Sequence, residues 1–376
     1  MKAQLNYKNT RVRRRTIFSV FLVLFSILYI SPSFAQNFFS NLFQGDGTRR
    51  RSNFEKHSDV SLGIGTSNYY GDIAPFNRPI QSTLQNIRWN ASFNYTRHFS
   101  PHLSGSVGFT WARISADDSK FEGVPGLDQL YMRNVHFRND VKELSFTGIY
   151  NFIPQTRSFR NREKIMPYVF AGIALFHHNP EAKVPSDYTG LDASSGDWIS
   201  LQPLSTEGQG LTSTDPRLTY ETQSYNLISV SIPFGVGVRY KLNHYWDLGF
   251  EAGVRYSFSD YLDDTGGYYA DFTDLATANS LSAVFGHREN EKFTALTGKD
   301  REGFIRNYYA TQGTKGSPPN PAFLDATLFP LNTLPTFDGA FGEGRNSSSR
   351  LNDMYVLTSF RIIYHIPPSI KCPVIR

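Results

Sequence analysis

The chain has 376 residues, of which 15% are aromatic, with a formal net charge of +5 and a single cysteine, Cys372. Six of the positive charges lie in the first 35 residues, where no acid occurs, so the rest of the chain carries about −1. This balance excludes a basic nucleic-acid-binding protein, and the lone cysteine excludes a disulfide within the chain.

Residues 1–35 predict a cleaved secretory signal peptide. A basic stretch that ends at Arg15 precedes an apolar run over residues 17–30, and a small-x-small site ends at Ala35. The apolar run is shorter than the ~20 residues of a membrane-spanning helix, which favours cleavage over a retained anchor. Residues 36–57 are expected to form a periplasmic spacer, either a disordered link or an arm that docks a partner.

Apolar and polar residues alternate with period 2 from residue 58 onward, which predicts β-strands with one face toward lipid and the other toward a polar interior. The segments are about ten residues long, the length of a tilted transmembrane strand. The fifth segment is apolar on both faces, so its register stays open. The eight segments span residues 60–65, 87–96, 103–112, 143–152, 167–177, 228–240, 246–258 and 354–366.

The connections between these segments alternate between short and long, as periplasmic turns and extracellular loops do in outer-membrane barrels. Short turns follow the second, fourth and sixth segments. Trp89, Trp111 and Trp246 fall on the presumed lipid face near strand ends, as interfacial aromatic girdles do. A soluble β-sandwich, the alternative, explains neither feature. The long connections span about 67–84, 116–137, 179–222 and 259–350.

The sequence therefore predicts an all-β fold, a transmembrane antiparallel up-and-down β-barrel of about eight strands with long extracellular loops. The barrel is expected over residues 58–366, in the cell outer membrane and in contact with its lipids, with a tail at 367–376. The insertion at 259–350 is too long for a structureless connection, so we expect it to be partly folded or functional. Extra strands hidden within it would change the count of eight.

An eight-stranded barrel has an interior just wide enough for its own side chains. Charged residues on the inward face are costly without partners, so we expect an ion-pair network that plugs the lumen rather than a conducting pore. The expected inward charges are Arg88, Glu143, Arg239, Asp247, Glu251, Arg255 and Arg361.

The sequence predicts no catalytic, cofactor-binding or metal-binding residue. His177 and His178 are adjacent and point to opposite faces if they lie on a strand, so they do not predict a shared metal. Asp260, Asp263 and Asp264 offer the oxygens that calcium prefers, but solvated loop rims are commoner. Serines and histidines are numerous without a recognisable nucleophile motif, so we expect no enzyme.

The connection between the fourth and fifth segments is polar and strongly charged. It carries Arg157, Arg160, Arg162 and Lys164 at the end of the barrel that we expect in the periplasm. We interpret these four residues as a candidate docking rim for a periplasmic partner.

Eight short stretches form a series along the chain: SNYYGD at 67–72, RISADD at 113–118, NVHFR at 134–138, VKEL at 141–144, PYVFAG at 167–172, PLSTEGQG at 203–210, IPFGVG at 232–237 and FSDYLDD at 258–264. Together they resemble the PorG-like outer-membrane barrels of the Bacteroidota type IX secretion system, in the family's order and over most of residues 58–270 plus the last strand. The segment 259–350 is longer than the family's usual final loop, and the tail beyond Ile366 also departs from the pattern.

The resemblance implies a barrel without catalytic activity that joins periplasmic ring components, a lipoprotein and its partner (PorK/PorN-like), to the outer membrane. A surface adhesin or ligand-binding barrel that acts through the long loops is the alternative. A lipid-modifying enzyme is a third possibility, because outer-membrane acyltransferases and deacylases use barrels of this size.

Overall fold

The computed structural model describes residues 54–74, 79–155, 160, 162–346 and 352–367, which belong to the compact unit that begins at Phe54. The predicted signal peptide at 1–35 lies outside the described residues. Most of the predicted spacer at 36–57 and of the predicted tail at 367–376 also lies outside them.

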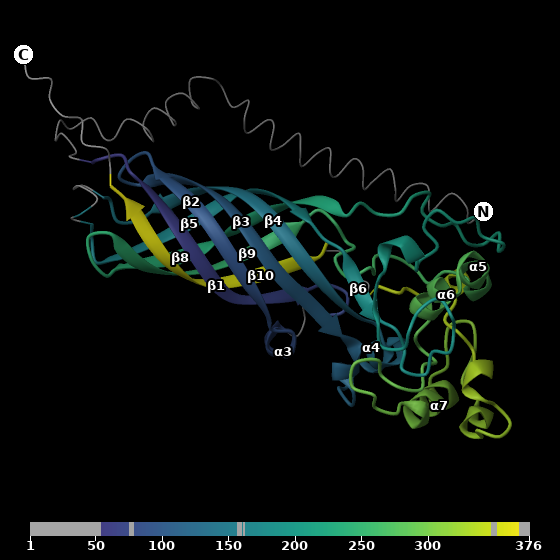
Figure 1. The fold of residues 1–376 in the computed structure, drawn as a ribbon. Helices are drawn as coiled ribbons and strands as arrows, with labels where there is room; N and C mark the ends of the chain where they lie inside the picture. The colour runs from purple at the N-terminus through teal and green to yellow at the C-terminus, as the bar shows by residue number, and fades with distance from the viewer. Residues whose placement is uncertain (1–53, 75–78, 156–159, 161, 347–351, 368–376) are drawn as a thin grey trace, which may run out of the picture. The chain divides into compact units, whose positions relative to one another are not determined.

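Eight antiparallel strands form the wall of a closed barrel (Figure 1). Their order is β3-β2-β1-β10-β9-β8-β5-β4, and pairing of β3 with β4 closes the cylinder. The prediction of an antiparallel up-and-down barrel of eight strands is therefore confirmed. The strands are β1 Ser58–Tyr70, β2 Arg88–His98, β3 Leu103–Asp117, β4 His136–Asn151, β5 Ile165–His177, β8 Ile228–Lys241, β9 Trp246–Ser257 and β10 Met354–Ile366.

Three strands run further than the alternation predicts, always at the end with the long loops. β1 continues to Tyr70, β3 continues to Asp117, and β4 begins at His136 instead of near residue 143. The extensions of β3 and β4 pair with each other over residues 113–117 and 136–140. Alternation fails there because both faces of these extensions are largely buried by the loops, so no polar face is required.

The fifth transmembrane strand, β5, has its register set by size matching inside the barrel. Its inward side chains include Tyr168 and Phe170, which lie over glycines of the neighbouring strands. A Cβ added to Gly237 would lie 2.3 Å from Cζ of Tyr168, and one added to Gly235 would lie 2.8 Å from Cζ of Phe170. The large inward residues of β5 therefore require glycine at the facing positions of β8.

The long loops contain short helices and two further strands. None of the helices in the described residues is long and apolar enough to cross a membrane. The strands β6 Pro180–Lys183 and β7 Trp198–Ser200 extend the sheet beyond β4 without entering the barrel wall. The helices are α3 Pro79–Gln85, η1 Asp118–Phe121, α4 Asp128–Arg133, η3 Gln202–Leu204, α5 Phe272–Ala278, α6 Ser280–Gly286, α7 Glu302–Thr311, η4 Pro321–Leu324, η5 Leu331–Thr333 and η6 Gly339–Phe341.

Residues 118–135, 178–227 and 258–346 pack together as a cap at one end of the barrel (Figure 1). Met132 of the first loop is buried with Ile305 and Tyr309 of the last loop. Leu204 of the middle loop is buried with Phe285 of the last. The long insertion is thus folded against its neighbours, and within the described ranges the strands outside the barrel lie in 178–227 rather than in 259–346.

Candidate functional site

The outer surface of the barrel is apolar and exposed, which is the reverse of a soluble protein. Such a continuous surface is stable only against lipid. Aromatic pairs lie near both edges, Trp89 with Trp111 at 5.1 Å between ring centroids and Trp246 with Tyr364 at 4.9 Å. The fold is therefore that of an outer-membrane β-barrel. The exposed belt includes Leu62, Ile64, Phe93, Phe109, Phe146, Ile173, Phe234, Val236, Leu248, Phe250, Phe360 and Ile362.

The lumen is closed at the short-turn end by two adjoining ion-pair groups. In the first, Asp59 of β1 contacts Nε2 of His98 at 2.7 Å and Nη1 of Arg239 at 3.5 Å. In the second, Asp247 of β9 contacts Nη2 of Arg162 at 2.6 Å and Nε2 of His365 at 2.7 Å. All of these side chains are almost fully buried.

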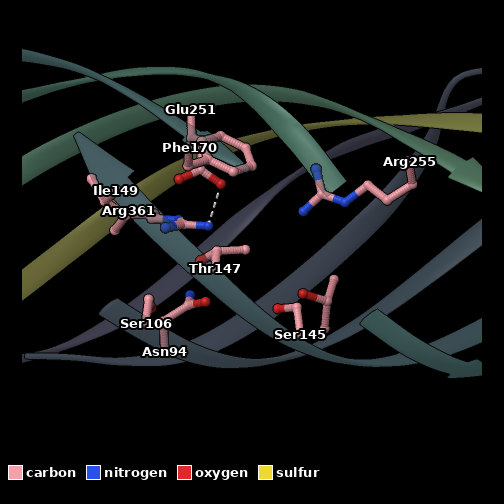
Figure 2. A pocket seen from close by; sticks show the side chains of 10 residues that line it. Asn94, Ser106, Ser145, Thr147, Ile149, Phe170, Glu251, Arg255 and Arg361 are labelled. Carbon is pink, nitrogen blue, oxygen red and sulfur yellow. Dashed lines mark hydrogen bonds and ion pairs between the residues drawn. The ribbon is translucent and has the colours of Figure 1, made fainter. Parts of the chain in front are cut away.

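Further along the lumen, each of two buried glutamates contacts one arginine and one tyrosine. Arg361 donates to Oε1 of Glu251 at 2.5 Å (Figure 2). The Tyr168 hydroxyl donates to the other oxygen of Glu251 at 3.0 Å. Arg255 lies 3.6 Å from Glu143, which accepts a 2.6 Å hydrogen bond from the Tyr355 hydroxyl.

A small polar cavity lies among these pairs, and its wall includes Glu251, Arg255 and Arg361 (Figure 2). Its volume of about 10 Å³ is about the space that one water molecule needs. In the part of the chain that the structure describes, side chains therefore fill the lumen at this level.

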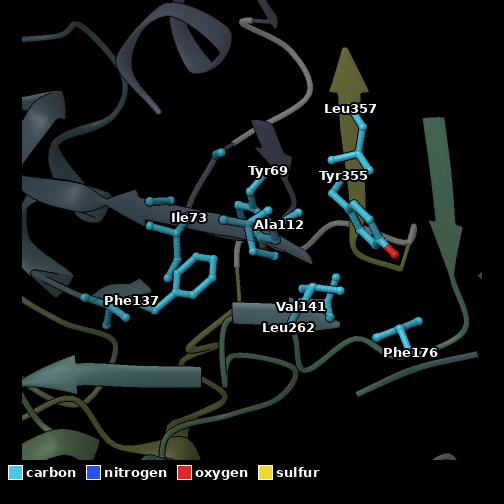
Figure 3. Close-up of a cluster of buried hydrophobic side chains, with 13 residues drawn as sticks. Tyr69, Ile73, Ala112, Phe137, Val141, Phe176, Leu262, Tyr355 and Leu357 are labelled. Atoms are coloured by element: carbon cyan, nitrogen blue, oxygen red, sulfur yellow. The ribbon is translucent and has the colours of Figure 1, made fainter. Parts of the chain in front are cut away.

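At the cap end, the lumen is closed by an apolar plug. Leu262 of the β9–β10 loop is fully buried beside Val141 of β4, in a cluster that includes Tyr69, Phe176 and Tyr355 (Figure 3). The backbone of Leu262 is fixed on both sides. Its carbonyl accepts from Asn139 at 2.8 Å, and its N–H donates to Asp353 at 2.8 Å.

The structure places six of the seven predicted inward charges in the lumen with an oppositely charged partner. The exception is Arg88, the first residue of β2, which is only half-buried and donates to the carbonyl of Ile87 at 2.8 Å. Arg88 keeps the inward phase of Asn90 and Asn94 on β2, but it lies at the rim of the barrel, where the strand begins. The six paired residues are Glu143, Arg239, Asp247, Glu251, Arg255 and Arg361.

The predicted docking rim is smaller than the sequence indicates. Arg162 is buried and bonded to Asp247 and to the carbonyls of the 242–245 turn, so it is not available to a partner. Arg160 and Lys164 are exposed at the short-turn end. Arg157 lies outside the described residues.

Sequence reasoning did not single out the partners Asp59, His98 and His365. The period-2 alternation could have found them, because each occupies an inward-facing position of its strand near the short-turn end. His365 shares the inward phase of Arg361, which the alternation did assign, but its relation to His98 depends on β1 lying between β2 and β10.

Buried arginines connect the loops of the cap to one another by donating hydrogen bonds, mostly to backbone carbonyls. Arg301 donates to the carbonyls of Tyr131 and Met132 at 2.8 Å each. Arg345 donates to the Thr206 hydroxyl at 2.8 Å and to the carbonyl of Asp264 at 2.5 Å. These bonds connect the three loops that make up the cap.

For two glutamates in the cap, the nearby arginines do not offset the energetic cost of burying a negative charge. Burial raises the pKa of Glu207 to about 7 against the opposing effect of Arg345. Burial likewise raises the pKa of Glu291 to about 7, although Arg288 lowers it. Desolvation outweighs the attraction of the arginines in both cases.

A family model described as "Domain of unknown function (DUF6089)" matches residues 51–197, which is less than half of the chain. No match was found among curated proteins.

Among solved structures, Neisserial surface protein A (NspA) has 11% identity and a TM-score of 0.28, with 54% of this chain and 84% of that chain covered. Ail of Yersinia pestis has 9% identity and a TM-score of 0.28, with 83% and 98% covered. OprG from Pseudomonas aeruginosa has 10% identity and a TM-score of 0.28, with 84% and 98% covered. At these scores the strand pairing of the chain itself, and not the likeness, establishes its fold.

Proposed function

We propose that this chain is a non-enzymatic component of the type IX protein secretion system that anchors periplasmic ring components to the outer membrane. The ring components are a lipoprotein and its partner (PorK/PorN-like), as the resemblance of residues 58–270 to PorG-like barrels implies. The chain would reach the outer membrane after cleavage of its signal peptide.

The observation that carries this proposal is the closed lumen. Ion pairs close the short-turn end, Leu262 closes the cap end, and the cavity between them accommodates about one water molecule. A barrel filled in this way is suited to act through its surfaces rather than as a channel. The short-turn end offers exposed charge at Arg160 and Lys164 for a periplasmic partner.

The first test is a gene deletion with measurement of type IX cargo in the culture medium. We expect cargo export to stop, and normal export in the deletion strain would reject the proposal. In the complemented strain, crosslinked pull-down from outer membranes is expected to recover the ring lipoprotein and its partner.

Charge reversal then locates the contact. The double variant R160E/K164E is expected to reduce recovery of ring components about tenfold, which corresponds to about 1.4 kcal/mol of binding free energy. The matched control is R217E/K299E, which reverses two exposed charges on the cap at the opposite end. Equal losses in both variants would contradict docking at the short-turn end.

A binding role for the cap is the second candidate function, favoured by its folded core and its exposed aromatic residues. Tyr268, Phe272 and Phe341 are exposed on a cap whose interior is packed, so such a surface is preorganised for a ligand. Alanine at these three positions should then abolish adherence to an extracellular ligand while cargo export continues. Under the anchor proposal the same variant has no effect on ring recovery.

A further inference from the structure

Three buried histidines meet at the short-turn end of the barrel. His57 immediately precedes β1, His98 is the last residue of β2, and His365 is the second-last residue of β10. Since β2, β1 and β10 are neighbours, the three rings face the same space, and none of the side chains is more than 2% exposed. One ring nitrogen from each histidine lies within 4.8 Å of those from the other two.

Each ring is hydrogen-bonded through one nitrogen to an oxygen that can only accept. Nε2 of His98 donates to Asp59 at 2.7 Å, and Nε2 of His365 donates to Asp247 at 2.7 Å. Nδ1 of His57 donates to the carbonyl of Glu55 at 2.9 Å. These bonds set the tautomer of a neutral imidazole, so the opposite nitrogen of each ring keeps its lone pair.

The lone pair on Nδ1 of His365 has no donor opposite it among the residues that the structure describes. Its Nδ1 is buried without a hydrogen-bond partner among the described residues. A buried polar atom of this kind is costly unless something satisfies it. The corresponding Nδ1 of His98 is bonded to the Ser104 hydroxyl at 2.7 Å, which is a bond that rotation of the hydroxyl can release.

We propose that His57, His98 and His365 form a binding site for one divalent transition-metal ion, with zinc as the expected occupant. Three neutral imidazoles are a known ligand set for zinc, which then keeps a fourth position for water or another ligand. Nitrogen ligands also favour zinc, copper or nickel over calcium or magnesium. The site is independent of the proposed secretion role.

The surroundings of the histidines match those of metal ligands. Histidines that bind metals generally donate their other N–H to a carboxylate or a backbone carbonyl, which fixes the ring and raises its basicity. Asp59 and Asp247 supply two such carboxylates, and Glu55 supplies the carbonyl. Each carboxylate is also shared with an arginine, Arg239 or Arg162.

Binding requires a modest rearrangement of His57. The rings of His57 and His98 are stacked, with centroids 4.3 Å apart and planes 17° from parallel, whereas a shared metal must lie near the plane of each ring. Rotation about the side-chain bonds of His57 can turn its ring and leave in place the backbone hydrogen bond from the N–H of His98 to the His57 carbonyl. The bound metal would then clamp residues 54–57, which lead into β1, to β2 and β10.

The test is metal binding by the folded, full mature chain in detergent micelles. Equilibrium dialysis against zinc, with metal content measured by mass spectrometry, is expected to give one zinc ion per chain. Cobalt should give the visible absorption of a tetrahedral nitrogen site. H57A and H365A are expected to lower the affinity at least tenfold, with the barrel fold checked by heat-modifiable gel mobility.

The matched control is H102A at the same end of the barrel. His102 bonds the carbonyl of Asn151 and stacks on Tyr150, outside the cluster. It is expected to bind zinc as the wild type does. Wild-type zinc content well below one ion per chain would overturn the proposal, as would unchanged affinity in folded H57A and H365A.

Discussion

The barrel wall and the cap solve the same problem, satisfaction of backbone polar groups, in different ways. In the wall, every strand pairs with two neighbours, so the ladder satisfies the backbone and leaves side chains free to alternate between lipid and lumen. In the cap, buried guanidinium groups such as those of Arg301 and Arg345 donate to loop carbonyls. The wall therefore depends on a repeated pattern and the cap on a few individual residues.

This difference predicts unequal sensitivity to mutation. A substitution in the wall is buffered by many equivalent hydrogen bonds, provided that it respects the two faces. A substitution of one cap arginine removes several bonds between loops at once and leaves buried acids without a cation.

The largest expected effect is that of R345M on the cap. Loss of the guanidinium leaves Asp264 and Glu207 buried without their cation, which costs about 3–5 kcal/mol. Hydrogen exchange should show lost protection in 258–346, whereas the barrel keeps its heat-modifiable mobility on gels. The control is R217M, which removes an exposed ion pair to Asp215 and should leave the protection of the cap almost unchanged, because water screens that pair. Simultaneous loss of protection in cap and wall would show that the two are one cooperative unit.

A second experiment places the same new charge on both regions. I173R puts an arginine on the exposed belt of β5 and is expected to destabilise the folded barrel by about 2–4 kcal/mol, because the charge meets acyl chains. L191R changes a fully exposed cap residue and is expected to have almost no effect, because its surroundings are water. Unfolding in urea from lipid vesicles measures both, and equal effects would mean that the belt does not face lipid.

The smallest effect is a pH dependence confined to the cap. Glu207 and Glu291 have pKa values of about 7 in the folded cap, so they bind more protons there than in unfolded loops, where a glutamate titrates near 4.5. Their contribution to stability is present below about pH 4.5 and is lost as the pH rises through about 7.

We expect cap protection in hydrogen exchange to fall between pH 5 and pH 8 by about 1 kcal/mol or more, with the wall unchanged. The variant E207Q/E291Q should show a smaller difference between the two pH values. A cap that becomes more protected at pH 8 would contradict this sign.

The strands of the wall were largely predictable because one physical rule governs them. Successive residues of a strand face lipid and lumen in turn and must therefore be apolar and polar in turn. This period-2 alternation identified β8, β9 and β10 to within about a residue of their ends. The rule failed at the extensions of β3 and β4, where the cap buries both faces. It was also silent on β5, whose inward aromatic residues depend on glycines of β8 and β9.

The candidate sites were predictable only in part, for a related reason. Alternation placed Glu251 and Arg361 on inward faces, and their pairing followed once β9 and β10 were neighbours. It could not reveal that Arg162 contacts Asp247, because Arg162 lies in a connection, where alternation does not predict the direction of a side chain.

By itself, the sequence determined that the chain alternates in segments long enough to cross a membrane, with short and long connections in turn. That information is local, since it resides in neighbouring residues. Only the tertiary structure decided what lies opposite what: the closure of β3 onto β4, the insertion of Leu262 into the barrel mouth, and the meeting of His57, His98 and His365. These depend on contacts between residues far apart in the chain, which form only when the cylinder closes.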